Sequence, residues 1–119
     1  MGFNWEKFWN VGGHLKDFSE EEEYQRSAVG RYYYACYLKA REAYNRKNNF
    51  RIGRRISHQG LIKKFKESNN ETEKKIGKYL EELLRFRKNA DYDLDFNTDV
   101  NSAKRKSKNL LECLKRIEK

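Results

Sequence analysis

The feature that most constrains the fold is the stretch SAVGRYYYACYLKAREAY at residues 27–44. At helical spacing Val29, Tyr33 and Cys36 fall on one stripe, and Arg31 is the only charged residue between positions 28 and 38. A helix that is apolar nearly all round belongs inside a protein. Its small residues allow close approach of other helices, whereas its tyrosines carry hydroxyls that need partners. The sequence therefore predicts a central helix, with part of its surface available to a second subunit.

Four further segments carry apolar residues at helical spacing and begin after residues that commonly cap helices. The predicted caps are Asn4, Ser57, Asn70 and Thr98. The third helix is expected to end at 68–70, the fourth to reach at least residue 87, and the segments 46–56 and 91–97 to be connectors. The pattern predicts an all-α fold, an up-and-down four-helix bundle with one short additional helix. We expect a single domain over residues 1–119.

Two local features refine this prediction. The run 19–23, SEEEE, is expected to provide the cap and acidic first turns of the central helix, which should end near residue 45. Gly12 and Gly13 interrupt the first helix, and each glycine costs about 1 kcal/mol relative to alanine. The sequence therefore predicts a kink or break at the glycine pair.

Charge points to the class of partner. The chain carries 27 basic and 18 acidic residues, which gives a net charge of +9. Such a balance favours a polyanionic partner, with nucleic acid first and an acidic protein second, unless the lysines serve only to keep the protein soluble. The aromatic content of 14% argues against a disordered chain.

The cysteines and the apolar segments bear on the compartment. Cys36 and Cys113 occupy apolar helical positions and have no ligand at metal-binding spacing, so we expect buried free thiols rather than a disulfide or a zinc site. No signal peptide is evident, and no apolar segment is long enough to span a membrane. These features predict a cytoplasmic protein without membrane association, metal or cofactor.

The end of the predicted fourth helix, LRFRKNADYD at 84–93, is the most unusual polar stretch. Cations at a helix C-terminus complement the helix dipole, which is one sufficient explanation for them. Guanidinium, amide and hydroxyl groups together are also what a phosphodiester site uses. The candidate residues in this stretch are Arg85, Arg87, Lys88, Asn89, Asp91 and Tyr92.

His58 is expected in the first turn of the third helix, directly after the pair Arg54 and Arg55. Its imidazole could donate a hydrogen bond to the connector, which is a structural role, or it could contact a phosphate. The structural role is the simpler explanation. Arg54, Arg55 and Arg31 complete the candidate nucleic-acid-binding residues. The other histidine, His14, has no evident partner in the sequence.

Three segments in this order resemble the HEPN domain family, and specifically its small stand-alone prokaryotic branch. They are RSAVGRYYYACYLKAR at 26–41, SHQGLI at 57–62 and LRFRKNADYD at 84–93. The resemblance implies a helical bundle that commonly dimerises and often acts as a metal-independent RNase in toxin–antitoxin or phage-defence systems. It also implies, as a partner, a nucleotidyltransferase-type antitoxin or another defence-system protein. In such nucleases an Arg…His motif from each subunit faces its copy across the dimer.

The chain departs from the family at this catalytic motif. Counting from Arg85 or Arg87 by the family spacing reaches Tyr92, where the nuclease has histidine. RNA cleavage without a metal needs a base for the 2′-hydroxyl proton, and tyrosine, with a pKa of about 10, is a poor base at neutral pH. His58 could replace it only if the fold brings it beside Arg87.

Two functions follow. In the first, the protein binds RNA or a nucleotide in a toxin–antitoxin or phage-defence system, with Arg87, Asp91, Tyr92 and His58 as candidate catalytic residues of an endoribonuclease. In the second, it is a non-catalytic module that forms a homodimer or docks on a partner protein through the tyrosine-rich helix. DNA binding is less favoured, because no helix-turn-helix spacing is present.

Overall fold

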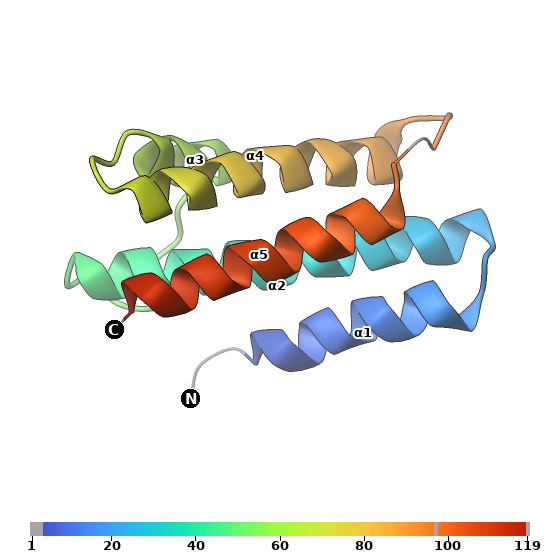
Figure 1. The fold of residues 1–119 in the computed structure, drawn as a ribbon, viewed down its shortest axis with the longest axis horizontal. Helices are drawn as coiled ribbons and strands as arrows, with labels where there is room; N and C mark the ends of the chain where they lie inside the picture. Colours follow the sequence, from blue (N-terminus) through green and yellow to red (C-terminus); the bar gives the residue numbers. More distant parts are fainter. Residues whose placement is uncertain (1–3, 97, 119) are drawn as a thin grey trace.

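The computed structural model describes residues 4–96 and 98–118, and within these ranges it contains five α-helices and no strand (Figure 1). The helices are α1 (Trp5–Phe18), α2 (Glu22–Lys47), α3 (His58–Lys66), α4 (Glu71–Tyr92) and α5 (Val100–Ile117). The prediction of an all-α fold is confirmed. None of the described helices is both long enough and apolar enough to cross a membrane.

The long helices alternate in direction along the chain. In Figure 1, α2 runs antiparallel to α1, α4 runs antiparallel to α2, and α5 runs antiparallel to α4. Helix α5 is therefore parallel to α2. Helix α2 packs against α1, α4 and α5, whereas the short α3 packs on α4. Helix α2 is therefore the central element, as the sequence predicted.

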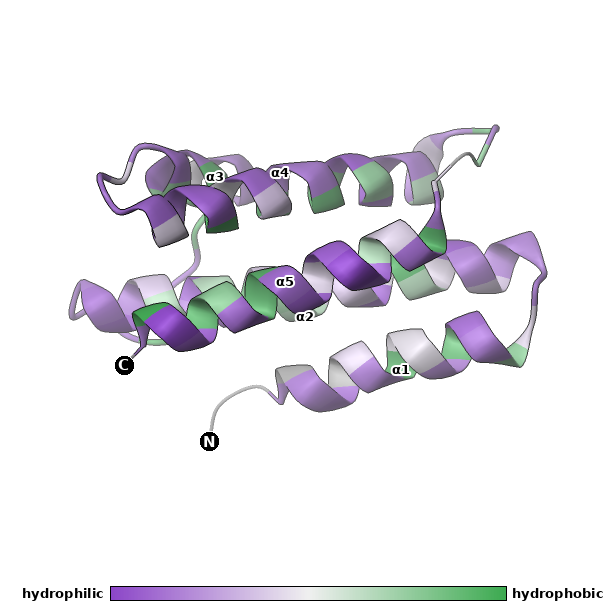
Figure 2. Ribbon diagram, viewed as in Figure 1, coloured by the Kyte–Doolittle hydropathy of each residue, from purple (hydrophilic) through white to green (hydrophobic). Residues whose placement is uncertain are grey.

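The core is built mainly on α2. Tyr32 and Tyr33 are completely buried, together with small residues of the same helix, and the apolar residues of the other helices pack around them. Figure 2 shows hydrophilic residues over most of the ribbon, with the hydrophobic bands of α4 on the side that faces α2 and α5. The rings of Tyr32 and Tyr33 are thus enclosed by their own chain, whereas Tyr34 of the same helix is only partly buried.

Three predicted N-caps are confirmed. The side-chain oxygen of Asn4 accepts a hydrogen bond from the Lys7 amide at 3.1 Å. The Ser57 hydroxyl accepts from the Gly60 amide at 3.0 Å, and the Asn70 side chain accepts in the same way from the Glu73 amide at 2.9 Å. Each cap uses a partner three residues ahead, which a sequence pattern can reveal.

Other predicted boundaries are wrong. Helix α5 is capped by Asp99, because the hydroxyl of Thr98 instead donates to the Asn89 side chain at 2.8 Å. Helix α4 continues to Tyr92, so residues 91 and 92, which were expected in the connector 91–97, belong to the helix. By contrast, the prediction for the run 19–23 is confirmed, because Glu21 is the N-cap of α2 and Glu22 and Glu23 lie in its first turn.

The predicted break at the glycine pair is also wrong, since α1 runs without interruption from Trp5 to Phe18. A Cβ atom on Gly12 would lie 3.0 Å from Cε1 of Tyr32 and 3.2 Å from Cβ of Arg31. The missing side chain lets α1 approach α2 closely. Tertiary packing thus offsets the low helix propensity of glycine.

A second close approach joins α3 to α4. A Cβ atom on Gly77 would lie 2.8 Å from the backbone nitrogen of Lys66 at the end of α3. A backbone atom cannot swing aside as the tip of a long side chain can. Gly77 therefore sets how closely α3 docks on α4, and with it the position of the residues at the start of α3.

We predict that Gly77→Ala destabilises the protein by about 1–3 kcal/mol, the usual range for overpacking, although alanine is the better helix former. Gly30→Ala is the matched control, because no atom lies within 4 Å of a Cβ at that position of α2. The control should stabilise by about 0.4–1 kcal/mol. Urea unfolding with an unchanged m-value measures both changes. Equal stabilisation by the two substitutions would contradict the proposed contact.

Candidate functional site

His58 is the first residue of α3, and its ring lies against tyrosines of α2. Its Nδ1 atom shares a hydrogen bond with the Tyr33 hydroxyl, and its ring stacks on Tyr37 with centroids 4.0 Å apart and planes 20° apart. The Tyr37 hydroxyl donates to the carbonyl oxygen of Ile56, just before α3. Core residues of α2 therefore fix both the orientation of the imidazole and the chain that carries it.

Arg87 of α4 reaches the same tyrosines. Its guanidinium carbon lies 4.6 Å from the centroid of the Tyr34 ring and 5.7 Å from that of Tyr33. Its Nε atom donates to the carboxylate of Asp91, one turn further along α4, at 2.9 Å. Tyr33 thus contacts both His58 and Arg87. The fold therefore brings His58 and Arg87 to the same tyrosine, which the sequence alone could not show.

The electrostatics of this cluster keep His58 neutral. Burial lowers the pKa of His58 below its usual value of about 6.5, and the positive charges of Arg87 and Lys88 lower it further. Burial raises the pKa of Tyr33, so that its hydroxyl stays protonated at neutral pH. The hydroxyl can donate or accept. When Nδ1 carries the imidazole proton and donates to Tyr33, Nε2 has the lone pair of a general base.

His58 also lines an open hollow of about 720 Å³ beside α2 and the segment that precedes α3. Its volume falls within the range of about 300–1,000 Å³ that is usual for ligand sites. Arg41 of α2 and Arg55 of the connector contribute two guanidinium groups, and no carboxylate lines the hollow. The arrangement is suited to an anion.

Sequence reasoning did not identify Tyr33, Tyr34, Tyr37 and Arg41 as site residues. The sequence did contain a signal, because Tyr34, Tyr37 and Arg41 recur at the three- and four-residue spacing of one helix face. Nothing in the spacing indicated that this face would meet His58.

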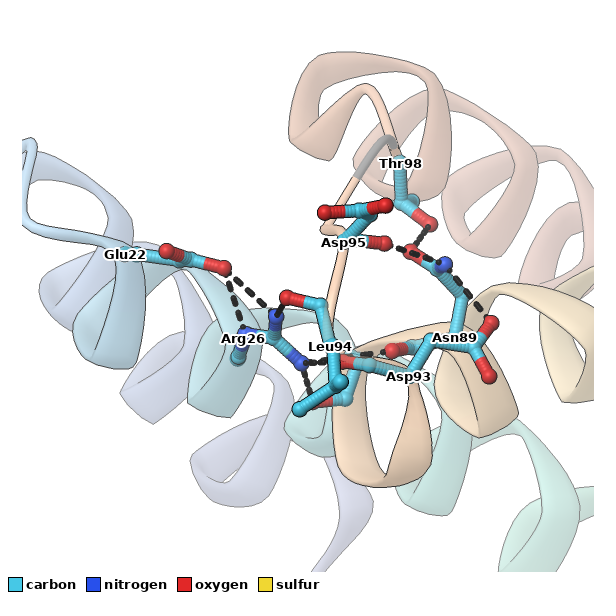
Figure 3. A network of polar contacts seen from close by, with 8 residues as sticks. Glu22, Arg26, Asn89, Asp93, Leu94, Asp95 and Thr98 are labelled. Atoms are coloured by element: carbon cyan, nitrogen blue, oxygen red, sulfur yellow. Dashed lines mark hydrogen bonds and ion pairs between the residues drawn. The ribbon is translucent and has the colours of Figure 1, made fainter.

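The residues predicted at the end of α4 lie in two places. Arg87 contacts the tyrosine cluster, whereas Arg85, Lys88 and Asn89 line a second open hollow of about 460 Å³. The amide nitrogen of Asn89 donates to the Asp93 carboxylate at 2.9 Å and to the carbonyl oxygen of Asp95 at 3.0 Å, and its amide oxygen accepts from Thr98 (Figure 3). These contacts give Asn89 a structural role in the connector between α4 and α5. Sequence analysis had placed it with the phosphate contacts.

Arg26 of α2 holds the same connector from the other side (Figure 3). Its guanidinium donates to the carbonyl oxygens of Ala90 at 2.8 Å, Asp93 at 2.7 Å and Leu94 at 3.1 Å, and it pairs with Glu22. These carbonyls lie at or just after the end of α4, where backbone acceptors lack partners within the helix. Arg26 therefore caps α4 and fixes the chain that follows.

The surroundings of four other predicted residues differ from those of His58 and Arg87, whereas Lys88 is close enough to His58 to lower its pKa. Tyr92 is 74% exposed and, within the described ranges, forms no hydrogen bond or ring contact. Arg85 lies over the Phe86 ring at 5.9 Å, and Arg54 lies over the Phe50 ring at 4.3 Å. Arg31 lies beside α1, next to the close approach at Gly12 described above.

Comparison with known proteins finds no family model that matches this chain, and no curated protein or solved structure matches it either. In the described part of the chain, no group of three or more histidine, cysteine, aspartate or glutamate side chains is placed to hold a metal ion.

We predict that His58 titrates below its usual pKa and that Arg87→Gln raises this pKa, because the substitution removes a nearby positive charge. Arg85→Gln is the matched control and should leave the His58 pKa unchanged. The imidazole resonances in a pH series of NMR spectra measure both. Because the folded pKa lies below the unfolded value, the contribution of His58 to stability should be complete above the unfolded pKa and be lost as pH falls through the folded one. An unchanged pKa in Arg87→Gln would contradict the electrostatic contact.

Proposed function

We propose that this chain is a HEPN-like protein that binds RNA at the His58–Arg87 cluster and cleaves it without a metal. In this proposal α1, α2, α4 and α5 are the helices of a four-helix bundle and α3 is the additional short helix. The observation that carries the proposal is the shared contact of His58 and Arg87 with Tyr33. It supplies a neutral base and a phosphate-binding cation on one rigid support.

The proposed reaction is an attack of the ribose 2′-oxygen on the adjacent phosphorus. Nε2 of His58 takes the 2′-hydroxyl proton while the O2′–P bond forms. The P–O5′ bond breaks, and the imidazolium gives its proton to the departing 5′-oxygen. The products are a 2′,3′-cyclic phosphate and a 5′-hydroxyl, so that no proton is gained or lost overall.

Arg87 is proposed to stabilise the charge that develops on the phosphate. Its Nε atom is held by Asp91, and its terminal nitrogens form no hydrogen bond with other described residues. These nitrogens are therefore available to non-bridging phosphate oxygens, for which a guanidinium is well suited. Asp91 acts in this proposal as the residue that orients Arg87, and Tyr92 has no catalytic part.

The biological setting rests on the sequence resemblance alone. A place in a toxin–antitoxin or phage-defence system, with a nucleotidyltransferase-type antitoxin as partner, is what that resemblance implies. The net charge of +9 supports the narrower proposal of a polyanionic ligand.

We predict that the purified protein cleaves labelled single-stranded RNA in the presence of EDTA and that His58→Gln slows cleavage by about 10²–10⁴-fold, the usual contribution of a general base. His14→Gln is the matched control, because it removes the other histidine, which is exposed on α1. Tyr92→Phe should cleave like the wild type. RNA binding by His58→Gln should persist and weaken steeply with salt. Wild-type cleavage rates in His58→Gln would remove the proposed base.

A second candidate function, homodimerisation, is favoured by an exposed apolar corner. Leu94 is 98% exposed and Tyr92 is 74% exposed, on a segment that Arg26 and Asn89 hold in place. Contact with another protein would remove both side chains from water. We propose a second copy of the chain as the occupant of this corner.

We predict that the wild type dimerises and that Leu94→Ser shifts the equilibrium toward monomer in sedimentation equilibrium, because it removes apolar area from the proposed contact. Ile52→Ser, at an exposed apolar position of the connector before α3, is the matched control and should leave the association unchanged. A wild type that stays monomeric at every concentration would exclude this contact.

A further inference from the structure

We propose that Arg41 and Arg55 form a second phosphate subsite, which binds the RNA phosphate next to the one that is cleaved. This inference rests on the proposed function and adds to it the class of substrate. The ligand would be an oligonucleotide with at least two consecutive phosphates, rather than a mononucleotide.

The first observation is that Arg41 contacts Tyr37 but has no carboxylate partner among the described residues. Its Nε atom is buried and has no hydrogen-bond partner among the described residues. Arg41 also forms no ion pair there, whereas Arg26, Arg46 and Arg87 all bind carboxylates. The charge of Arg41 is therefore not neutralised by a carboxylate of the described residues, and a phosphate in the hollow beside it would supply the missing negative charge.

The second observation is the hollow that Arg41 lines. Arg55 and His58 share it, and its lining residues include two arginines and no acid. It lies at the N-terminal end of α3, where the helix dipole favours a negative group. The charge and the shape of the hollow thus both favour an anion at this position.

The third observation is the spacing along α2. Arg87 lies over Tyr34, whereas Arg41 is seven residues further along the helix, which is about 10 Å at 1.5 Å per residue. Two arginines held at different positions along one helix suit two neighbouring phosphates of a strand. His58 stacks on Tyr37, between the two. A nucleotide chain along this face would place one phosphate at Arg87 and the next at Arg41 and Arg55.

The experiment compares 2′-O-methyl dinucleotides, which cannot be cleaved. UpU has one phosphate, whereas pUpU and UpUp carry a second at the 5′ or 3′ end. Calorimetry should show that one of the two-phosphate ligands binds the wild type about 10-fold more tightly than UpU, as expected for a charge-assisted contact. Arg41→Gln should remove this gain. Arg55→Gln changes an exposed residue, so it tests the subsite even if Arg41→Gln fails to fold. It should reduce the gain in affinity that the second phosphate provides.

Arg85→Gln is the matched control, because Arg85 does not line the hollow, and it should keep the full gain. The subsite is overturned if neither two-phosphate ligand binds better than UpU, or if the gain is the same in the wild type and in both hollow variants. Loss of cleavage in His58→Gln together with no phosphate gain would reject the subsite and leave the proposed base intact. A gain that depends on Arg41 in a protein that does not cleave RNA would support the subsite and reject the nuclease.

Discussion

The interaction on which the rest depends is the hydrogen bonding of two tyrosine hydroxyls of α2 to the start of α3; the hydroxyl of a third core tyrosine, Tyr32, is buried without a partner among the described residues. The hydroxyl of Tyr33 meets the His58 imidazole, and that of Tyr37 meets the carbonyl oxygen of Ile56. A buried hydroxyl left without a partner would be destabilising by about 1–3 kcal/mol. These bonds connect the middle of α2 to the start of α3. Together with the close contact at Gly77, they hold α3 against both α2 and α4.

The candidate site is a consequence of the same packing. Arg87 lies over the edge of the tyrosine cluster, so its position and that of His58 are determined by one set of rings. The support is rigid and partly desolvated, which disfavours the charged form of His58 and suits a base that must be neutral at pH 7. Core and site are therefore not independent: a change to Tyr33 alters both the packing of α2 and the orientation of the imidazole.

Short-range features of the fold could be predicted from the sequence. The caps at Asn4, Ser57 and Asn70 use partners three residues away, and the sequence contains both members of each pair. The errors occurred where a distant residue changed the outcome. Thr98 bonds Asn89 instead of capping α5, and Gly12 permits a contact with Tyr32 instead of interrupting α1. Local propensity is a weak guide wherever tertiary contacts compete with it.

By itself, the sequence determined the helical class, the central place of α2 and the presence of an arginine-rich stretch and a histidine that follows two arginines. Only the tertiary structure decided which of these residues meet. It brought His58 and Arg87 to the same tyrosine, Tyr33, left Tyr92 exposed, and committed Asn89 to the connector. The physical reason is that periodicity fixes the face of a helix on which a residue lies. Which faces come together depends on how closely the backbones approach and on which buried polar groups find partners.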